Sequence, residues 1–298
     1  MTATRAAKPQ PPPPTRRSIA FRALAAWAAM GLALGAAGPV STALAQQWGF
    51  GRTGRQALAA LIVGLAVTAF ILWLNGKADR RSLAALGLGP AGDAARGFTM
   101  GVVITGGAAG LVVIPAAAAG WIGFGAVEWG SLLAFLALNA LIAFGLEALP
   151  EELVFRGYIF TALRRRGGRF AAGLGTTVLF CLIMLPTSAA ASATAALLGE
   201  ESDGLLLAPA GTDPVTYIVL LACFGTALLA ARAATGSLWT CIALHLTFLT
   251  VNRLVFANAD RDTGWQVEPA PDAAVLVLVY VLLAAAVFGL LARVRRRR

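Results

Sequence analysis

Eight long apolar runs dominate this chain of 298 residues. Each is close to the length of about 20 residues that a helix needs to cross a hydrocarbon layer about 30 Å thick. Alternating strands of a membrane barrel do not produce such continuous runs. The sequence therefore predicts an all-α polytopic membrane protein, a bundle of eight transmembrane helices. The runs cover roughly residues 19–45, 56–75, 97–119, 131–149, 170–190, 214–233, 237–256 and 273–293.

The composition agrees with a bilayer as the solvent. Apolar residues make up 58% of the chain, charged residues 13%, and the mean hydropathy is +0.76. A water-soluble domain carries about 25% charged residues, so this chain has too little polar surface to be one. The net charge of +10 would suggest nucleic acid as a partner in a soluble protein.

The positions of the cations indicate a topology instead. Most of the 24 Lys and Arg residues fall in segments that eight crossings place on one side of the membrane. Cytoplasmic loops collect Lys and Arg, so both termini are expected in the cytoplasm. We predict a multi-pass protein of a bacterial cell membrane, surrounded by membrane lipids and without a nucleic-acid partner. The cation-rich segments are the N-terminal arm, residues 77–96, residues 164–169, Arg232 and the C-terminal tail.

The composition of the N-terminal region and the positions of the spans divide the chain into four parts. Residues 1–18 combine a proline run with cations and no apolar face, which predicts a disordered cytoplasmic arm. The next run ends in Ala43-Leu44-Ala45, so it is either a cleavable signal or, as the many later spans favour, an uncleaved anchor. The predicted parts that follow the arm are the N-terminal spans 19–119, a core 131–256, and the last loop, span and tail 257–298.

Common metal and redox motifs are missing from the sequence. Cys181, Cys223 and Cys241 lie in apolar runs without CxxC or Cys/His ligand spacing, which argues against a disulfide framework, a zinc site or an iron-sulfur site. The chain has one histidine and no HExxH pattern. We therefore expect no metal and no cofactor.

Ionisable residues at membrane depth are functional candidates, because burying them is costly. Glu152 and Arg156 are four residues apart, so on a helix they face each other and can pair. Glu151 points about 100° away and remains an unpaired carboxylate that could take a proton from water. Glu147, on the same face as Glu151, is either a further pocket carboxylate or an interfacial group.

A structural interpretation of the same residues is also open. Pro150 followed by two glutamates is typical of a helix start, with the acids in the first turn against the helix dipole. The segment with Arg156 and residues 164–166 would then be an interfacial helix. His245 would likewise be a polar residue packed between helices. Spacing alone does not decide between this interpretation and a polar active site.

The run Glu151-Glu152-Leu153-Val154-Phe155-Arg156-Gly157-Tyr158 resembles the EExxxR motif of the CPBP family. These are intramembrane proteases related to the CAAX prenyl endopeptidase and to bacteriocin-immunity (Abi) proteins. The similarity extends over roughly residues 131–256, less than half of the chain. Its further elements are the basic stretch after the helix, Phe180, and Gly236-Ser237-Leu238-Trp239 leading into His245.

The resemblance implies roles for four residues. Glu151 would be the base that activates water, and Glu152 with Arg156 would be its supporting pair. His245 matches the histidine of an HxxxN motif that is thought to stabilise the oxyanion. We expect Glu151 to face His245 across a water-accessible space between the glutamate helix and the fifth, sixth and seventh spans.

Two positions depart from the family pattern. Met184 stands where an FxxxH motif has its histidine, and a thioether cannot shuttle a proton. Leu249 stands where the HxxxN motif has its asparagine and offers no donor. Asn252, seven residues after His245, falls near the same helical face and is a possible supporting residue.

Two function classes follow. The first is an intramembrane CPBP/CAAX-type endopeptidase that hydrolyses a peptide bond in a membrane-tethered or prenylated substrate. The second is a catalytically degenerate scaffold, or a peptide- or lipid-binding protein of the same fold, which Met184 favours. A small-solute transporter would instead carry charges at corresponding positions of two halves, whereas here they gather on one helix.

Overall fold

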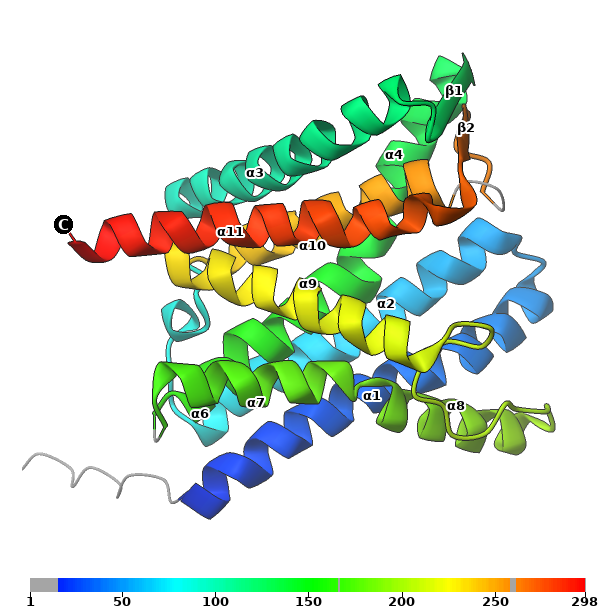
Figure 1. Ribbon diagram of the computed structural model, residues 1–298. Helices are drawn as coiled ribbons and strands as arrows, with labels where there is room; N and C mark the ends of the chain where they lie inside the picture. The colour runs from blue at the N-terminus through cyan, green and yellow to red at the C-terminus, as the bar shows by residue number, and fades with distance from the viewer. Residues whose placement is uncertain (1–15, 166, 258–260, 298) are drawn as a thin grey trace, which may run out of the picture.

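The computed structural model describes residues 16–165, 167–257 and 261–297. Within these ranges eight helices are long and apolar enough to cross a membrane, which confirms the predicted polytopic all-α fold. Their axes run along one common direction, from one end of the bundle to the other (Figure 1). The eight spans are Arg17–Trp48, Arg52–Ala78, Leu83–Ala118, Trp129–Leu163, Arg169–Leu198, Pro214–Thr235, Leu238–Phe256 and Pro271–Arg297.

Several spans are built from more than one helical element. The α-helices are α1 (Arg16–Trp48), α2 (Arg52–Trp73), α3 (Ala91–Ala118), α4 (Trp129–Ala143), α5 (Leu149–Glu152), α6 (Phe160–Leu163), α7 (Arg169–Cys181), α8 (Met184–Leu198), α9 (Pro214–Thr235), α10 (Leu238–Val251) and α11 (Val275–Arg297). The π-helices are η1 (Leu74–Ala78), η3 (Phe144–Ala148), η4 (Leu153–Ile159) and η5 (Asn252–Phe256). Two short 3₁₀-helices are η2 (Leu83–Leu86) and η6 (Pro271–Ala274).

The start of α1 and the end of α11 lie at the same end of the bundle, on the left of Figure 1. We call this the terminal end. The turns 79–82 and 236–237 and the junction between α6 and α7 lie there too, so the described residues of the cation-rich segments share one end. Most of the predicted arm at residues 1–18, together with Arg166 and Asp260, lies outside the described residues. Residues 16–18 already belong to α1.

The opposite end carries a small sheet that the sequence analysis did not predict. Strand β1 (Ile122–Val127) pairs antiparallel with β2 (Trp265–Pro269), and Phe124 stacks on Trp265 with ring centroids 4.9 Å apart. The pairing joins the loop after the third span to the loop before the last (Figure 1). Strands this short, partly made of glycine, leave little periodic signal beside long helical runs.

The fourth span is continuous through Pro150. Elements α4, η3, α5, η4 and α6 follow one another without a break from Trp129 to Leu163. The interpretation of Pro150 as the start of a separate interfacial helix is therefore wrong. Proline lacks the N–H that an inner helical turn needs, and the wider π turn just before it accommodates this loss. The glutamates thus lie inside a membrane span.

Asp79 ties three segments together at the terminal end. Its carboxylate forms an ion pair with Arg22 of α1 and accepts a hydrogen bond of 2.7 Å from the Tyr158 hydroxyl of η4. The Asp79 side chain is only 6% exposed. A buried carboxylate needs such partners, so this cluster fixes the end of η4 against α1 and the turn after η1.

Small residues allow close contact between α1 and α8. A Cβ atom added to Gly35 would lie 2.0 Å from the Thr187 carbonyl oxygen, and one added to Gly31 would lie 2.3 Å from Pro186. Close backbone approach at glycine is how helices pack in lipid, where apolar side chains gain little by leaving the acyl chains.

We predict that Gly35→Ala lowers the apparent melting temperature of the protein in detergent. The new methyl group must push backbone atoms of α8 aside, at a cost of about 1 to 3 kcal/mol. Gly107→Ala is the matched control, because a Cβ atom there meets nothing within 4 Å. Equal melting temperatures for the two variants would show that α1 and α8 do not pack as described.

Candidate active site

Glu152, Arg156 and His245 form a buried polar cluster between the fourth and seventh spans. One oxygen, Glu152 Oε1, is 3.1 Å from Arg156 Nη1 and 3.1 Å from His245 Nδ1. The side chains of Glu152 and Arg156 are 0% exposed, and that of His245 is 4% exposed. The predicted pair between Glu152 and Arg156 is therefore present, and it includes the histidine of α10.

Aromatic rings enclose this cluster. The Arg156 guanidinium lies over the Phe180 ring of α7, with Cζ 4.2 Å from the ring centroid. Phe224 of α9 packs edge-on against the His245 imidazole with centroids 4.9 Å apart, and stacks on Phe248 at 4.1 Å. A weakly hydrated guanidinium on an aromatic face is a favourable way to bury this charge. The fifth, sixth and seventh spans all contribute to the enclosure, as expected.

Glu151 is the carboxylate without a partner. Its side chain is half-buried, and no hydrogen bond or ion pair to it exists among the described residues. It lies within electrostatic range of His245, Glu147, Glu152 and Arg156. Glu151 thus borders the buried cluster without a bond to any described residue.

The direct partner of the imidazole differs from the expected one. We expected His245 to face Glu151, whereas its Nδ1 is hydrogen-bonded to Glu152. A proton on Nδ1, donated to the carboxylate, fixes the ring orientation. The other ring nitrogen, Nε2, has no hydrogen-bond partner among the described residues. The Glu152 carboxylate therefore has two functions: it is the counter-ion of Arg156, and it orients the His245 ring.

A second polar group lies towards the opposite end of the bundle. Glu147 of η3 forms an ion pair with Arg253 of η5. Arg253 Nη1 also donates to Asn139 Oδ1 at 2.8 Å, and Asn139 Nδ2 donates to the Thr250 hydroxyl at 3.2 Å. Glu147 is thus a carboxylate of the same span as Glu152, and Arg253 is its counter-ion. Sequence reasoning missed Arg253, although an arginine within a membrane span is itself a signal.

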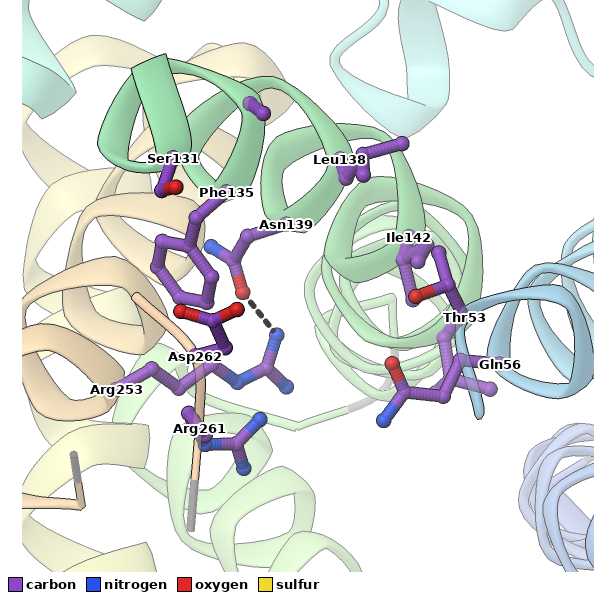
Figure 2. A pocket seen from close by; sticks show the side chains of 12 residues that line it. Thr53, Gln56, Ser131, Phe135, Leu138, Asn139, Ile142, Arg253, Arg261 and Asp262 are labelled. Carbon is purple, nitrogen blue, oxygen red and sulfur yellow. Dashed lines mark hydrogen bonds between the residues drawn. The ribbon is translucent and has the colours of Figure 1, made fainter. Parts of the chain in front are cut away.

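This second group borders a cavity of about 390 Å³ (Figure 2). Figure 2 shows the Asn139 amide bonded to the Arg253 guanidinium, with Asp262 and Phe135 beside them. The far wall carries Thr53 and Gln56 from the start of α2. The cavity therefore reaches from the Glu147 pair to the end of the bundle opposite the termini.

The three remaining sequence candidates lie elsewhere. Asn252 accepts a hydrogen bond of 3.2 Å from the Tyr280 hydroxyl of α11. Met184 begins α8, after the break that follows α7, and lines a separate cavity of about 290 Å³ with Thr187 and Ser188. Leu249 is half-buried on α10 and contributes no polar atom. None of the three contacts Glu152, Arg156 or His245 through a hydrogen bond.

The comparison with protein families bears on this arrangement. The family model described as type II CAAX prenyl endopeptidase Rce1-like matches residues 129–251. This segment, less than half of the chain, is therefore similar to the CAAX proteases of the CPBP family. The predicted resemblance is confirmed, and the match covers the fourth span to the end of α10, with every residue of the buried cluster. Neither the curated proteins nor the solved structures contain a match to this chain.

The described side chains of residues 129–251 do not assemble a metal site. Within the described ranges, no three His, Cys, Asp or Glu side chains are grouped so that they could hold an ion. Glu152 already shares its Oε1 between Arg156 and His245.

We predict that Glu152→Gln is strongly destabilising. The variant leaves the Arg156 charge buried without a counter-ion, and breaking a buried pair in this way costs about 3 to 5 kcal/mol. Glu151→Gln is the matched control, because it removes a neighbouring carboxylate that has no partner. Thermal unfolding in detergent measures both. A Glu152→Gln variant as stable as Glu151→Gln would refute the pairing.

Proposed function

We propose that the protein is an intramembrane endopeptidase that hydrolyses a peptide bond with water activated by Glu151. One observation carries this proposal: Glu151 has no bonded partner among the described residues and lies within electrostatic range of His245, while Glu152 Oε1 is shared by Arg156 and the same histidine. The match of residues 129–251 to a CAAX prenyl endopeptidase family supports the reaction class. A free carboxylate next to an oriented imidazole is a suitable pair for general acid–base chemistry.

Charge balance supports the division of roles. Glu147 is matched by Arg253 and Glu152 by Arg156, and a protonated His245 would match Glu151. In a low-dielectric site, unmatched charges are costly, so Glu151 and His245 are the two groups whose proton occupancy can change together. The other two pairs hold the helices in place.

The proposed reaction proceeds by addition and elimination. Glu151 takes one proton from a water molecule, and the resulting hydroxide adds to the carbonyl carbon of the substrate. His245 in its protonated form is held by the bond from Nδ1–H to Glu152, and its second N–H, at Nε2, donates a hydrogen bond to the developing oxyanion. The carbon–nitrogen bond then breaks, and Glu151 returns its proton to the leaving amine. The products are a carboxylic acid and an amine.

The cavity beside Arg253 is the proposed route for substrate and water. It combines apolar walls from α4 with polar groups at both ends, which suits an extended peptide held at the membrane surface. We infer from the cation distribution that both termini are cytoplasmic. The cavity then faces the outer side of the membrane, and the substrate class is a membrane-tethered peptide, prenylated or otherwise, presented from that side.

A non-enzymatic function is the second candidate. Met184 and Leu249 replace the histidine and asparagine of the two further family motifs, and no polar side chain occupies either position. In this case the pocket would bind a peptide or a lipid tail without cleaving it. The same experiment separates the two functions.

We predict that the purified protein in detergent cleaves members of a library of prenylated and otherwise lipid-tethered peptides, detected by mass spectrometry. Glu151→Gln should reduce cleavage by about 10² to 10⁴, the usual contribution of a general base. Its melting temperature should stay near that of the wild type, because Glu151 has no bonded partner.

Untethered versions of the same peptides are the substrate control and should be cleaved more slowly. Cleavage that is unchanged in Glu151→Gln would contradict the assignment of the base. Peptides that bind to the wild type but are never cleaved would support the non-enzymatic function instead.

We also predict the side on which the cavity opens. In intact cells, Thr53→Cys at the cavity mouth should react with a membrane-impermeant maleimide, whereas Ala84→Cys at the terminal end should react only after permeabilisation. Both positions are exposed. The wild type, with Cys181, Cys223 and Cys241, supplies the background. The reverse labelling pattern would place the termini outside and the cavity towards the cytoplasm.

A further inference from the structure

The chain has three tyrosines, and they differ in whether the hydroxyl has a hydrogen-bond partner. The Tyr158 hydroxyl donates to Asp79 at 2.7 Å, and the Tyr280 hydroxyl donates to Asn252 at 3.2 Å. The Tyr217 hydroxyl has no hydrogen-bond partner among the described residues, although the side chain is half-buried. A phenol inside a membrane span normally has a partner, because an unpaired hydroxyl is costly there.

The helical position of Tyr217 directs it towards the site. It precedes Phe224 by seven residues on α9, so the two side chains share nearly the same face, about 10 Å apart along the axis. Phe224 is the ring that packs against His245. Ile218, the next residue, accepts a weak hydrogen bond of 3.8 Å from Cys181 Sγ, which places this turn of α9 beside the end of α7.

The direction along α9 also matters. The helix begins at the end of the bundle opposite the termini, so Tyr217 lies on that side of the imidazole. The carboxylates on that side are Glu151 and Glu147, and both are within electrostatic range of the Tyr217 hydroxyl. Neither accepts a hydrogen bond from it. The phenol and the two carboxylates therefore lie on the same side of His245, close enough to interact electrostatically.

The position on α10 that lacks a hydrogen-bond donor lies on the same side of His245 as Tyr217. Leu249 is one helical turn beyond His245 on α10, again towards the opposite end, and has no polar group. A neutral phenol is a donor and does not need to lose its proton. We propose that the Tyr217 hydroxyl hydrogen-bonds the carbonyl oxygen of the peptide under attack and so supplies the donor that Leu249 cannot.

The proposal rests on the peptidase function and adds one contact to it. When hydroxide adds to the carbonyl carbon, the electron pair of the carbonyl double bond moves to the oxygen, which becomes negatively charged. Tyr217 and His245 Nε2 donate hydrogen bonds to this oxygen from two different helices. No proton is transferred from the phenol, and when the double bond re-forms, the hydrogen bond weakens again. Tyr217 thus acts more strongly on the transition state than on the bound substrate.

Tyr217→Phe is the direct test, because it removes only the hydroxyl. The substrate is the lipid-tethered peptide that the wild type cleaves fastest, and the inhibitor is the same peptide with a phosphinate in place of the scissile amide. The kcat of Tyr217→Phe should fall by about 10² to 10³, as for loss of one oxyanion donor, with little change in KM. Phosphinate affinity should fall as well, while the melting temperature stays unchanged.

Tyr280→Phe is the matched control. It also removes one phenol hydroxyl, but that hydroxyl bonds to Asn252, so this variant should melt earlier and keep its phosphinate affinity. The double variant Tyr217→Phe/Leu249→Asn should have a kcat at least tenfold higher than that of Tyr217→Phe, because the new amide supplies a donor.

The outcomes separate the two proposals. If the wild type cleaves and Tyr217→Phe has the same kcat and phosphinate affinity, the role of Tyr217 is refuted while the peptidase function stands. A folded double variant without any recovery of kcat would refute the contact with the carbonyl oxygen. If the wild type neither cleaves any peptide nor binds the phosphinate, the peptidase function fails, and the role of Tyr217 fails with it.

Discussion

The buried charge of Arg156 is the constraint on which the core of this protein depends. A guanidinium that is 0% exposed in a membrane bundle must have a counter-ion and a polarisable surface nearby. Glu152 supplies the first from one turn earlier on the same span, and Phe180 of the fifth span supplies the second. Because the same carboxylate also holds His245, one neutralised charge connects the fourth, fifth and seventh spans.

This arrangement leaves the neighbouring carboxylate, that of Glu151, without a bond to any described residue. Two adjacent carboxylates on a helix point in different directions, so only one of them can face Arg156 and His245. The π-helical turns η3 and η4 on either side of α5 widen the helix around this point, and such turns are frequent at functional sites. They also carry the span past Pro150 without interruption. A strong structural pair and a free carboxylate can therefore occupy consecutive positions of one continuous helix.

The features that could be predicted from the sequence are those that depend on local spacing. The eight spans follow from the lengths of the apolar runs, and the pair of Glu152 and Arg156 follows from a separation of four residues. The bond from His245 to Glu152 and the pair of Arg253 and Glu147 depend instead on how two helices cross, which one sequence does not contain. Asn252 shows the same limit: its seven-residue spacing from His245 suggested the site, but π-helix η5 begins there and its partner is Tyr280 on α11.

The two altered motif positions have different structural consequences. Met184 comes after the break between α7 and α8, and it lines a cavity with Pro39 of α1 and Ser188, away from the buried cluster. Leu249, by contrast, lies on the same helix as His245, one turn further towards the end of the bundle opposite the termini. In the proposed reaction, Leu249 leaves the oxyanion without a donor from α10, and compensation would come from another helix. Helix α9 is the one we propose, because Phe224 packs against His245 and Tyr217, seven residues earlier, lies on nearly the same face and within electrostatic range of Glu151. A protein in which the hydrogen-bond donor has moved from α10 to α9 would lack the family's third motif and still keep its chemistry.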